Sequence, residues 1–244
     1  MIVIVAGFAK RAQVCIDIVS GIDVSEFCDH KYTMLINAKP ETTPTSAHER
    51  VYRGLRGAIM HGELPPGQAL TVRGLASSYE VSMTPAREAS RRVAAEGALT
   101  VSSSGRVTTP ELANDRSEEL AALRALVEVE LASRALPRAH MALIDRLQAI
   151  NARIAEAIEH HNSVDYIRRN LEFHRTLYLR AQAPAMLAKA ETVWLQMGPS
   201  MRALYGRLNR TEAPQYPRLI IAALTAGDEP GLSLAVRADV TQGL

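Results

Sequence analysis

A short segment near residue 85 combines groups that could bind nucleic acid. The run Ser82-Met83-Thr84-Pro85-Ala86-Arg87-Glu88-Ala89 is followed by Arg91. On a helix that opens at Thr84, Arg87 and Arg91 lie four positions apart and share one face with Thr84. The planar guanidinium of arginine can donate two hydrogen bonds to guanine in the major groove of DNA. An isolated arginine pair is more often part of a solvated helix face. The surrounding elements must therefore decide between that interpretation and DNA binding.

Those elements begin with two predicted helices. Val51, Leu55 and Ile59 recur every four residues, which indicates a first helix from about Ala47 that ends before the Pro-Pro-Gly turn at 65–67. A second short helix is expected over residues 72–79. A tight turn at 80–82 then leads into the segment that carries Arg87.

The third helix is expected to use Thr84 as its N-cap and Pro85 as its first helical residue, and to end at Glu96-Gly97. Two β-prone stretches, 99–102 and 106–109, follow as a hairpin. Its tip at Gly105 and Arg106 could reach a phosphate or the minor groove. Three helices and a hairpin in this order predict a winged helix-turn-helix, which favours the DNA-binding interpretation of Arg87 and Arg91.

Charge is distributed unevenly along the 244 residues. The net charge is +2, but residues 46–110 carry eight basic groups, all arginine, and five acidic groups, a net of +3 (8 − 5). That excess is compatible with a nucleic-acid-binding module but is too small for binding through phosphates alone. A non-specific DNA-binding protein is therefore the less favoured alternative.

The first 45 residues are expected to be an extension and a linker outside the main fold. They hold both cysteines, Cys15 and Cys28, and end in a proline-punctuated polar stretch. No Cys-x-x-Cys pair, basic-led signal sequence or long apolar run occurs. We expect a cytoplasmic protein without a membrane partner, and we expect a chain starting at Met34 to keep the fold.

From residue 114 to the C-terminus the pattern is helical throughout. Successive apolar stripes predict six helices, the first with Leu120, Leu123, Val127 and Leu131 on its inner face. The fourth is expected to be disturbed at Gly198-Pro199. The fold class predicted is mostly α, with a winged helix-turn-helix at 46–110 and an antiparallel α-helical bundle at 114–244.

Residues 47–110 resemble the winged helix-turn-helix of the GntR family of regulators. The resemblance runs through Gly62-Glu63-Leu64-Pro65-Pro66-Gly67, Leu75-Ala76, Val81-Ser82, Thr84-Pro85, Arg87-Glu88-Ala89 and Glu96-Gly97. It implies DNA contacts by Arg73, Thr84, Arg87, Gly105 and Arg106. Two residues depart from the family pattern: Met83 stands where arginine is usual, and Ser90 where leucine is usual.

Most of residues 114–240 are similar to the FadR-type ligand-binding domain of the same family. The similarity lies in Leu123-Arg124 with Glu128, in Asn170-Leu171-Glu172-Phe173-His174 and in Ala226-Gly227-Asp228. It implies an effector site that includes Arg124, Asn170, His174 and Asp239. The guanidinium of Arg124 would suit a carboxylate, although His174 could equally be a core histidine bonded to a neighbour.

The resemblance also raises the question of a metal. Many relatives hold an ion with one aspartate and three histidines, but here the corresponding positions are Asn170, His174, Pro217 and Asp239. Only His174 and Asp239 keep good ligands, so we expect no metal and no other cofactor.

The function expected is that of a ligand-responsive, sequence-specific DNA-binding transcription regulator of a metabolic or transport operon, not an enzyme. Its partners would be double-stranded operator DNA, read as a homodimer, and a small effector. The alternative of a metal-dependent enzyme is disfavoured, because the sequence shows no nucleophile–base pair and no complete ligand set.

Overall fold

The structure is a computed structural model that describes residues 46–102, 106–207 and 215–241. All of these residues belong to one compact unit, Thr45–Leu244. The expectations for residues 1–45, including the Met34 start, and for Gly105 lie outside the described residues. No described helix is both long enough and apolar enough to cross a membrane.

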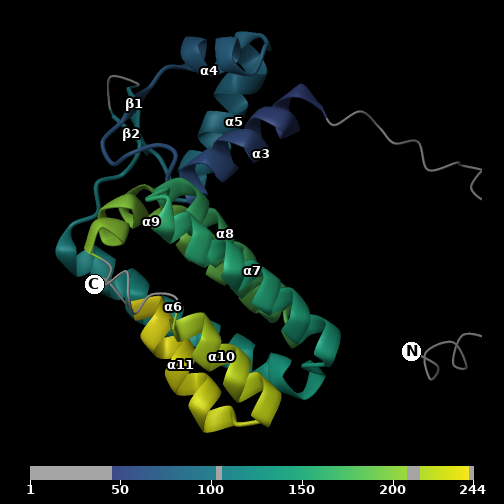
Figure 1. Ribbon diagram of the computed structural model, residues 1–244. Coiled ribbons are helices and arrows are strands. Elements are labelled where there is room, and N and C mark those ends of the chain that lie inside the picture. The colour runs from purple at the N-terminus through teal and green to yellow at the C-terminus, as the bar shows by residue number, and fades with distance from the viewer. Residues whose placement is uncertain (1–45, 103–105, 208–214, 242–244) are drawn as a thin grey trace, which may run out of the picture. The chain divides into compact units, whose positions relative to one another are not determined.

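The N-terminal part of this unit is a winged helix-turn-helix. Its helices are α3 (Ala47–Met60), α4 (Val72–Ser78) and α5 (Met83–Ala95). Three two-residue strands, β1 (Ala69–Leu70), β2 (Thr100–Val101) and β3 (Val107–Thr108), pair antiparallel in the order β1-β3-β2. Figure 1 shows α4 and α5 on one side of α3, with the strands beside them. The predicted hairpin is therefore present, and β1, which is too short to show an alternating pattern, extends it to a sheet.

The start of α5 corrects one sequence-based expectation. The helix begins at Met83 with Ser82 as its N-cap residue, so Thr84 is not the cap and Pro85 is the third helical residue. The first amide groups of a helix have no intrahelical acceptor. Proline therefore costs no hydrogen bond anywhere in the first turn, and its presence does not identify the first residue.

The core of the winged helix is formed by the predicted apolar stripes. Val51, Leu55 and Ile59 of α3 are at most 1% exposed and pack with Ala86, Ala89 and Val93 of α5. Ser90 is also buried, and its hydroxyl donates to the carbonyl of Ala86 at 2.8 Å. The polar atom at this position is thus satisfied within its own helix.

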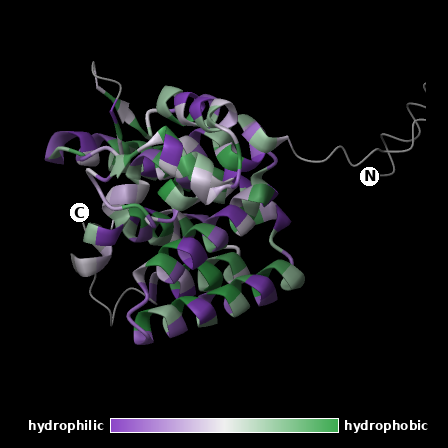
Figure 2. Cartoon of the chain, turned by 90° about the horizontal axis from the view of Figure 1, so that it is seen from above, coloured by the Kyte–Doolittle hydropathy of each residue, from purple (hydrophilic) through white to green (hydrophobic). Residues whose placement is uncertain are grey.

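Within the described residues, six α-helices form the C-terminal bundle. They are α6 (Asn114–Ala135), α7 (Met141–Glu159), α8 (Ser163–Tyr178), α9 (Pro184–Arg207), α10 (Gln215–Ala226) and α11 (Glu229–Thr241). Figure 2 shows that the apolar residues, drawn green, follow one side of the bundle helices while polar residues occupy the other side. Burying these stripes against one another accounts for the bundle.

One detail of the bundle differs from the expectation. Leu123 is 41% exposed, because the inner face of α6 carries Arg124 and Glu128 instead. Gly198 and Pro199, where the sequence predicts a disturbance, lie inside α9, which continues through both residues. Proline removes one hydrogen bond from a helix interior, but buried residues on several sides of α9 hold this helix in place.

Candidate functional sites

The exposed face of α5 carries the residues that the sequence singled out. Thr84, Arg87 and Arg91 are all exposed, while Ala86 and Ala89 on the opposite face are fully buried. The helix thus divides into an apolar side that fixes it to α3 and a basic side that meets solvent. A basic helix face of this kind is suited to the major groove of DNA.

The third arginine of α5 differs from the first two. Arg92 donates to Glu49 at 2.9 Å, and its guanidinium lies 3.5 Å from the centre of the Tyr52 ring. Among the described residues, no carboxylate lies within 4.0 Å of Arg87 or Arg91. Arg92 therefore stabilises the domain, and Arg87 and Arg91 remain available to an external anion.

The remaining predicted DNA-contacting residues lie on neighbouring elements. Arg73 is exposed in the first turn of α4, and Arg106 is exposed just before β3. The amide of Arg106 donates to the hydroxyl of Ser102 at 3.0 Å, which shapes the base of the wing. Met83, which replaces a usual arginine, is 40% exposed and adds an apolar group to this surface.

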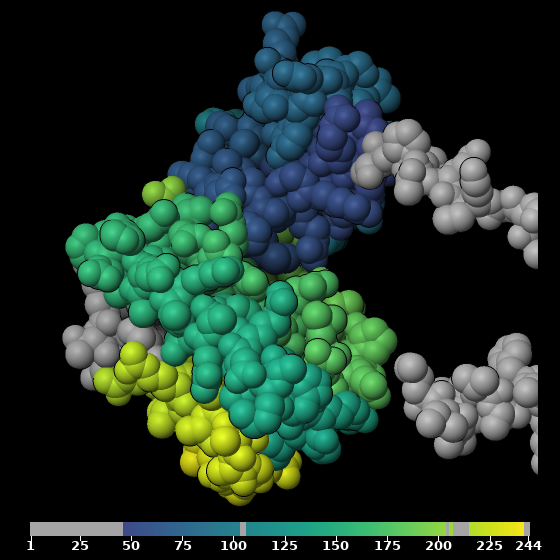
Figure 3. Space-filling view, turned by 45° about the vertical axis from the view of Figure 1, so that its right-hand side comes forward, coloured from purple at the N-terminus to yellow at the C-terminus, as the bar shows by residue number. Residues whose placement is uncertain are grey.

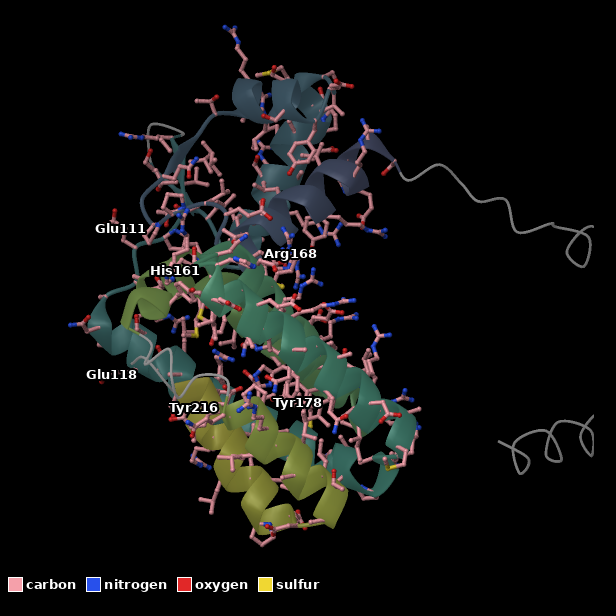
Figure 4. The ribbon with its side chains drawn as sticks, viewed as in Figure 1. Glu111, Glu118, His161, Arg168, Tyr178 and Tyr216 are labelled. Carbon is pink, nitrogen blue, oxygen red and sulfur yellow. The ribbon has the colours of Figure 1, made fainter. Side chains whose placement is uncertain are left out.

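A second candidate site lies inside the bundle. The four residues predicted for the effector are 0–5% exposed and come from three helices, Arg124 from α6, Asn170 and His174 from α8, and Asp239 from α11. Figure 4 shows Tyr178, one turn beyond His174, in the interior of the bundle. Buried polar groups cost free energy unless they are paired. The contacts of this cluster therefore show which of its polar atoms have partners within the protein.

Glu128 is the centre of these contacts. Its Oε1 accepts hydrogen bonds from Arg124 Nε at 2.6 Å and from Trp194 Nε1 at 2.8 Å, and its Oε2 accepts from the Tyr178 hydroxyl at 3.1 Å. Arg124 donates to Glu128 through its Nε alone. Among the described residues, the two Nη groups of Arg124 have no hydrogen-bond acceptor.

The network continues from Tyr178 to His174 and Asp239. Because Tyr178 donates its proton to Glu128, its oxygen accepts from His174 Nδ1 at 2.9 Å. His174 Nε2 then faces Asp239 Oδ2 at 2.7 Å. Tyr178 thus connects the buried Arg124–Glu128 pair to His174, and His174 in turn lies against Asp239.

Burial and charge act in opposite directions on the ionisable groups of this cluster. Burial would raise the pKa of Glu128, but Arg124, His174 and the hydrogen bonds outweigh burial and lower the pKa below its usual 4.5. For Arg124, burial would lower the pKa, yet Glu128 raises it above its usual value. Burial raises the pKa of Tyr178 well above 10. The Arg124–Glu128 pair is therefore ionised, and Tyr178 acts as a neutral hydrogen-bond donor.

Sequence reasoning misses part of this network. In the sequence, Glu128 is only a point of family similarity, and neither Tyr178 nor Trp194 is predicted for the site. The available signal is the i,i+4 spacing of Arg124 and Glu128 on the inner stripe of α6. Tyr178 and Trp194 carry no such signal, because contacts between α8, α9 and α6 depend on tertiary packing.

The residues do not fit a transition metal. No group of three or more His, Cys, Asp or Glu side chains with ligand geometry occurs within the described part of the chain. His174 Nε2 and Asp239 Oδ2 face one another at 2.7 Å, and Pro217, at the third family position, has no ligating atom. A single imidazole and a single carboxylate are too few for a stable zinc-like site.

A groove on the bundle is separate from this cluster. It has a volume of about 630 Å³ and lies between α7 and α10, lined by Gln148, Asn151, Arg218, Ile221, Ala222, Thr225 and Ala226. None of the predicted effector residues lines it. The groove is lined mainly by exposed side chains, so its shape alone identifies no ligand.

Comparisons with known proteins agree with both halves of this architecture. Residues 47–108 match the model of bacterial regulatory proteins of the gntR family, and residues 119–242 match the FCD domain. The chain is 30% identical over 187 residues to the HTH-type transcriptional regulator McbR of Escherichia coli (strain K12), covering 75% of this chain and 84% of McbR.

Solved structures give the same result. The structure of E. coli McbR/YncC superposes with a TM-score of 0.74 at 27% identity, covering 81% of this chain and 94% of that one. A GntR regulator from Rhodococcus sp. RHA1 shares the fold at 18% identity, with a TM-score of 0.64 over 80% of this chain and 94% of that one. The chain belongs to the GntR family and, with its FCD effector-binding domain, is a ligand-responsive DNA-binding transcription regulator.

Proposed function

We propose that this regulator binds a specific operator of a metabolic or transport operon as a homodimer. In each subunit Arg87, Arg91 and Thr84 of α5 enter the major groove, while Arg73 and the wing at Gly105 and Arg106 contact the backbone or the minor groove. The observation that carries this proposal is the contrast within α5. Arg92 is held by Glu49 and Tyr52, and Arg87 and Arg91 project from the exposed face without an ion-pair partner among the described residues.

The test is the affinity of Arg87→Ala for a duplex obtained by in vitro selection with the wild-type protein. Loss of one bidentate guanine contact costs about 1–3 kcal/mol per half-site, and a dimer loses two. Arg87 is exposed, so the variant is expected to keep the wild-type melting temperature. If a gel-shift titration shows wild-type affinity, the assignment of α5 as the recognition helix is wrong.

A matched control separates specific contacts from charge. Arg153 is an exposed arginine on α7, and Arg153→Ala removes the same charge from the bundle. We expect Arg153→Ala to bind the selected duplex like the wild type. An equal loss in both variants would favour non-specific, charge-driven binding.

We further propose that the effector binds at the buried polar cluster through Arg124, Asn170, His174 and Asp239. The two Nη groups of Arg124 are donors without an acceptor in the described structure, and their geometry suits a carboxylate. Asn170 supplies an amide one turn before His174. An anion bound there would rely on these donors.

A thermal-shift screen of small carboxylates and their amides tests this site. A ligand at 100 times its dissociation constant stabilises the folded state by about 2.7 kcal/mol. Asn170→Ala should abolish the shift. Asn151→Ala, which changes another buried asparagine of the bundle, on α7, should preserve it. A shift that survives Asn170→Ala and disappears in Asn151→Ala would move the effector to the groove between α7 and α10.

A further inference from the structure

We infer that residues 194–198 of α9 couple the buried polar cluster to the recognition helix. This inference rests on the proposed function, because it concerns how occupancy of the effector site reaches the DNA-binding face. It follows from the contacts of consecutive residues on α9, which join the bundle cluster at one side and the C-terminal end of α5 at the other.

α9 is shared by three separate apolar clusters. Trp194 packs in the core of the bundle, Leu195 is 0% exposed in the core of the winged helix, and Met197 packs with Leu120 of α6 in a third cluster. Among the described residues, Leu195 is the bundle residue that completes the hydrophobic core of the DNA-binding part. Figure 3 shows the surface of the winged helix, drawn purple and blue, in direct contact with the green atoms of the bundle.

On the bundle side, Trp194 belongs to the polar cluster. Its indole N–H donates to Glu128 Oε1, which also accepts from Arg124. The other carboxylate oxygen accepts from Tyr178, which is bonded to His174. Any ligand that withdraws Arg124 or His174 from these contacts changes the hydrogen bonds of Glu128, and with them the position that Trp194 prefers.

On the DNA-binding side, Gln196 is bonded to the end of the recognition helix. Its Nε2 donates to the main-chain carbonyl of Glu96 at 2.9 Å, and its Oε1 accepts from Arg116 at 3.2 Å. Glu96 is the C-cap residue of α5, so Gln196 satisfies a carbonyl that the helix leaves without an intrahelical donor. The side chain of Glu96 accepts from Tyr52 of α3 at 2.6 Å.

The two backbones also touch directly. A Cβ placed on Gly198 would lie 2.1 Å from the carbonyl oxygen of Ile59, at the end of α3. Gly62, with φ +66°, lies against the carbonyl of Gly198, and Arg168 of α8 pairs with Glu63 at 2.9 Å. Figure 4 shows Arg168 at the end of α8 nearest to α3. With so little space between α9 and α3, a displacement of α9 cannot be absorbed locally.

These contacts give the coupling a physical basis. Trp194 and Gln196 are two residues apart on a rigid helix. A rotation or shift of α9 that follows a new position of Trp194 must therefore also move Gln196. Packed cores respond to such shifts by changing between discrete arrangements. The bond from Gln196 to Glu96 then transmits the change to the last turn of α5, which determines how Arg87 and Arg91 are presented.

Hydrogen exchange measures this coupling without DNA or an effector. Tyr178→Phe deletes only the hydroxyl that joins His174 to Glu128, and Gln196→Ala deletes the bond to Glu96. In the wild-type background, Tyr178→Phe should speed the exchange of amides 93–98, in the last residues of α5 and just after them, by about 2- to 10-fold, the effect of one weakened hydrogen bond. In the Gln196→Ala background it should have no further effect, because the connection is already broken.

The control experiment follows the exchange of the same amides, 93–98. Gln148→Ala changes an exposed glutamine of α7, and Tyr178→Phe should retain its full effect in that background. The amides of α7 serve as a reference for global opening, and Trp194→Phe replaces Tyr178→Phe as the perturbation if that variant opens globally. Additive effects of Tyr178→Phe and Gln196→Ala, or no effect of either perturbation on α5, would overturn the inference.

Trp194 provides the functional measurement, because it is the single tryptophan of the chain. Coupling is reciprocal, so binding of the selected duplex to the wild type should change the Trp194 emission. In Gln196→Ala, the duplex should still bind, as followed by anisotropy of labelled DNA, while the emission change is lost. Binding with an unchanged emission in the wild type, or the same change in Gln196→Ala, contradicts the coupling. A wild type that binds no duplex contradicts the proposed function instead, and the exchange measurements still decide the coupling.

Discussion

Two arginine–glutamate pairs on α6 have the same i,i+4 spacing and nearly the same separation between their charged atoms, but their surroundings differ. Arg124 and Glu128 are 2.6 Å apart with side chains at most 5% exposed, and Arg134 and Glu130 are 2.7 Å apart with side chains about half exposed. Removing two charges from water is costly, so the buried pair depends on each partner to offset the other. The exposed pair has water as an alternative partner, and we expect it to contribute little.

The first prediction uses this contrast. Arg124→Met should lower the free energy of unfolding by about 3–5 kcal/mol, because it leaves Glu128 charged and buried. Arg134→Met should cost no more than about 0.5 kcal/mol. Urea unfolding at neutral pH measures both values, and equal costs would show that the polar cluster is not a stabilising network.

The pH dependence of this cost has a definite sign. In the wild type the pKa of Glu128 is below 4.5. Its contribution to stability is therefore complete above that value and is lost only as the pH falls through the lower, folded-state pKa. Without Arg124, burial raises the pKa of Glu128, so protonation relieves the penalty as the pH falls. The difference between Arg124→Met and the wild type should shrink steadily from pH 7 toward 4.5, and a constant difference would contradict this account.

A second prediction concerns metal content. The protein purified without added metal should carry no stoichiometric transition metal, because only His174 and Asp239 keep good ligands at the family positions. Losing two of four ligands should weaken binding severely. Elemental analysis measures this directly. About one zinc or nickel per chain that disappears in His174→Ala would overturn the prediction.

At the scale of elements, two glycines allow opposite outcomes for the same substitution. Gly57 lies within α3, and a Cβ added to it would meet no atom within 4 Å, whereas a Cβ on Gly198 of α9 would meet the carbonyl of Ile59. Gly57→Ala should stabilise the protein by about 0.5–1 kcal/mol, because alanine loses less entropy in a helix. Gly198→Ala should destabilise it by about 1–3 kcal/mol through overpacking. Thermal unfolding of both variants tests this, and a tolerated Gly198→Ala would show that α3 and α9 can separate.

The sequence predicts these elements where one periodic face is apolar. The stripes of α3, α7 and α8 are buried as expected, since Val51, Leu147 and Ile167 are 0% exposed. On α6 the rule fails because the inner face holds a charged pair and Leu123 points outward. α9 continues through Pro199 because several cores hold it. In both cases tertiary packing overrides the local preference.

The same limit applies to the two candidate sites. The arginine face of α5 is predictable, because the spacing of Arg87 and Arg91 depends on one helix only. The polar cluster is predictable only in part. Arg124, Asn170, His174 and Asp239 follow from the family pattern, but the contacts of Glu128 with Tyr178 and Trp194 join three helices and leave no periodic signal in the sequence.

At the scale of the whole molecule, the proposed homodimer relates two recognition helices by a two-fold axis. Each α5 then reads one half-site, and the spacing between half-sites is fixed by the distance between the helices. Binding of the second half-site is intramolecular once the first is bound. An operator with both half-sites should therefore be bound about 10²- to 10⁴-fold more tightly than a single half-site.

The last prediction tests this geometry through the DNA. Inserting about five base pairs, half a helical turn, at the centre of the selected duplex places the half-sites on opposite faces of the DNA. Affinity should fall to that of a single half-site. A central substitution that keeps the length of the duplex should have a far smaller effect, because the central bases lie between the two helices. Anisotropy titrations at one fixed salt concentration compare the three duplexes, since phosphate contacts depend on salt. If the inserted duplex binds as tightly as the original, each subunit binds DNA independently and the two-fold arrangement is wrong.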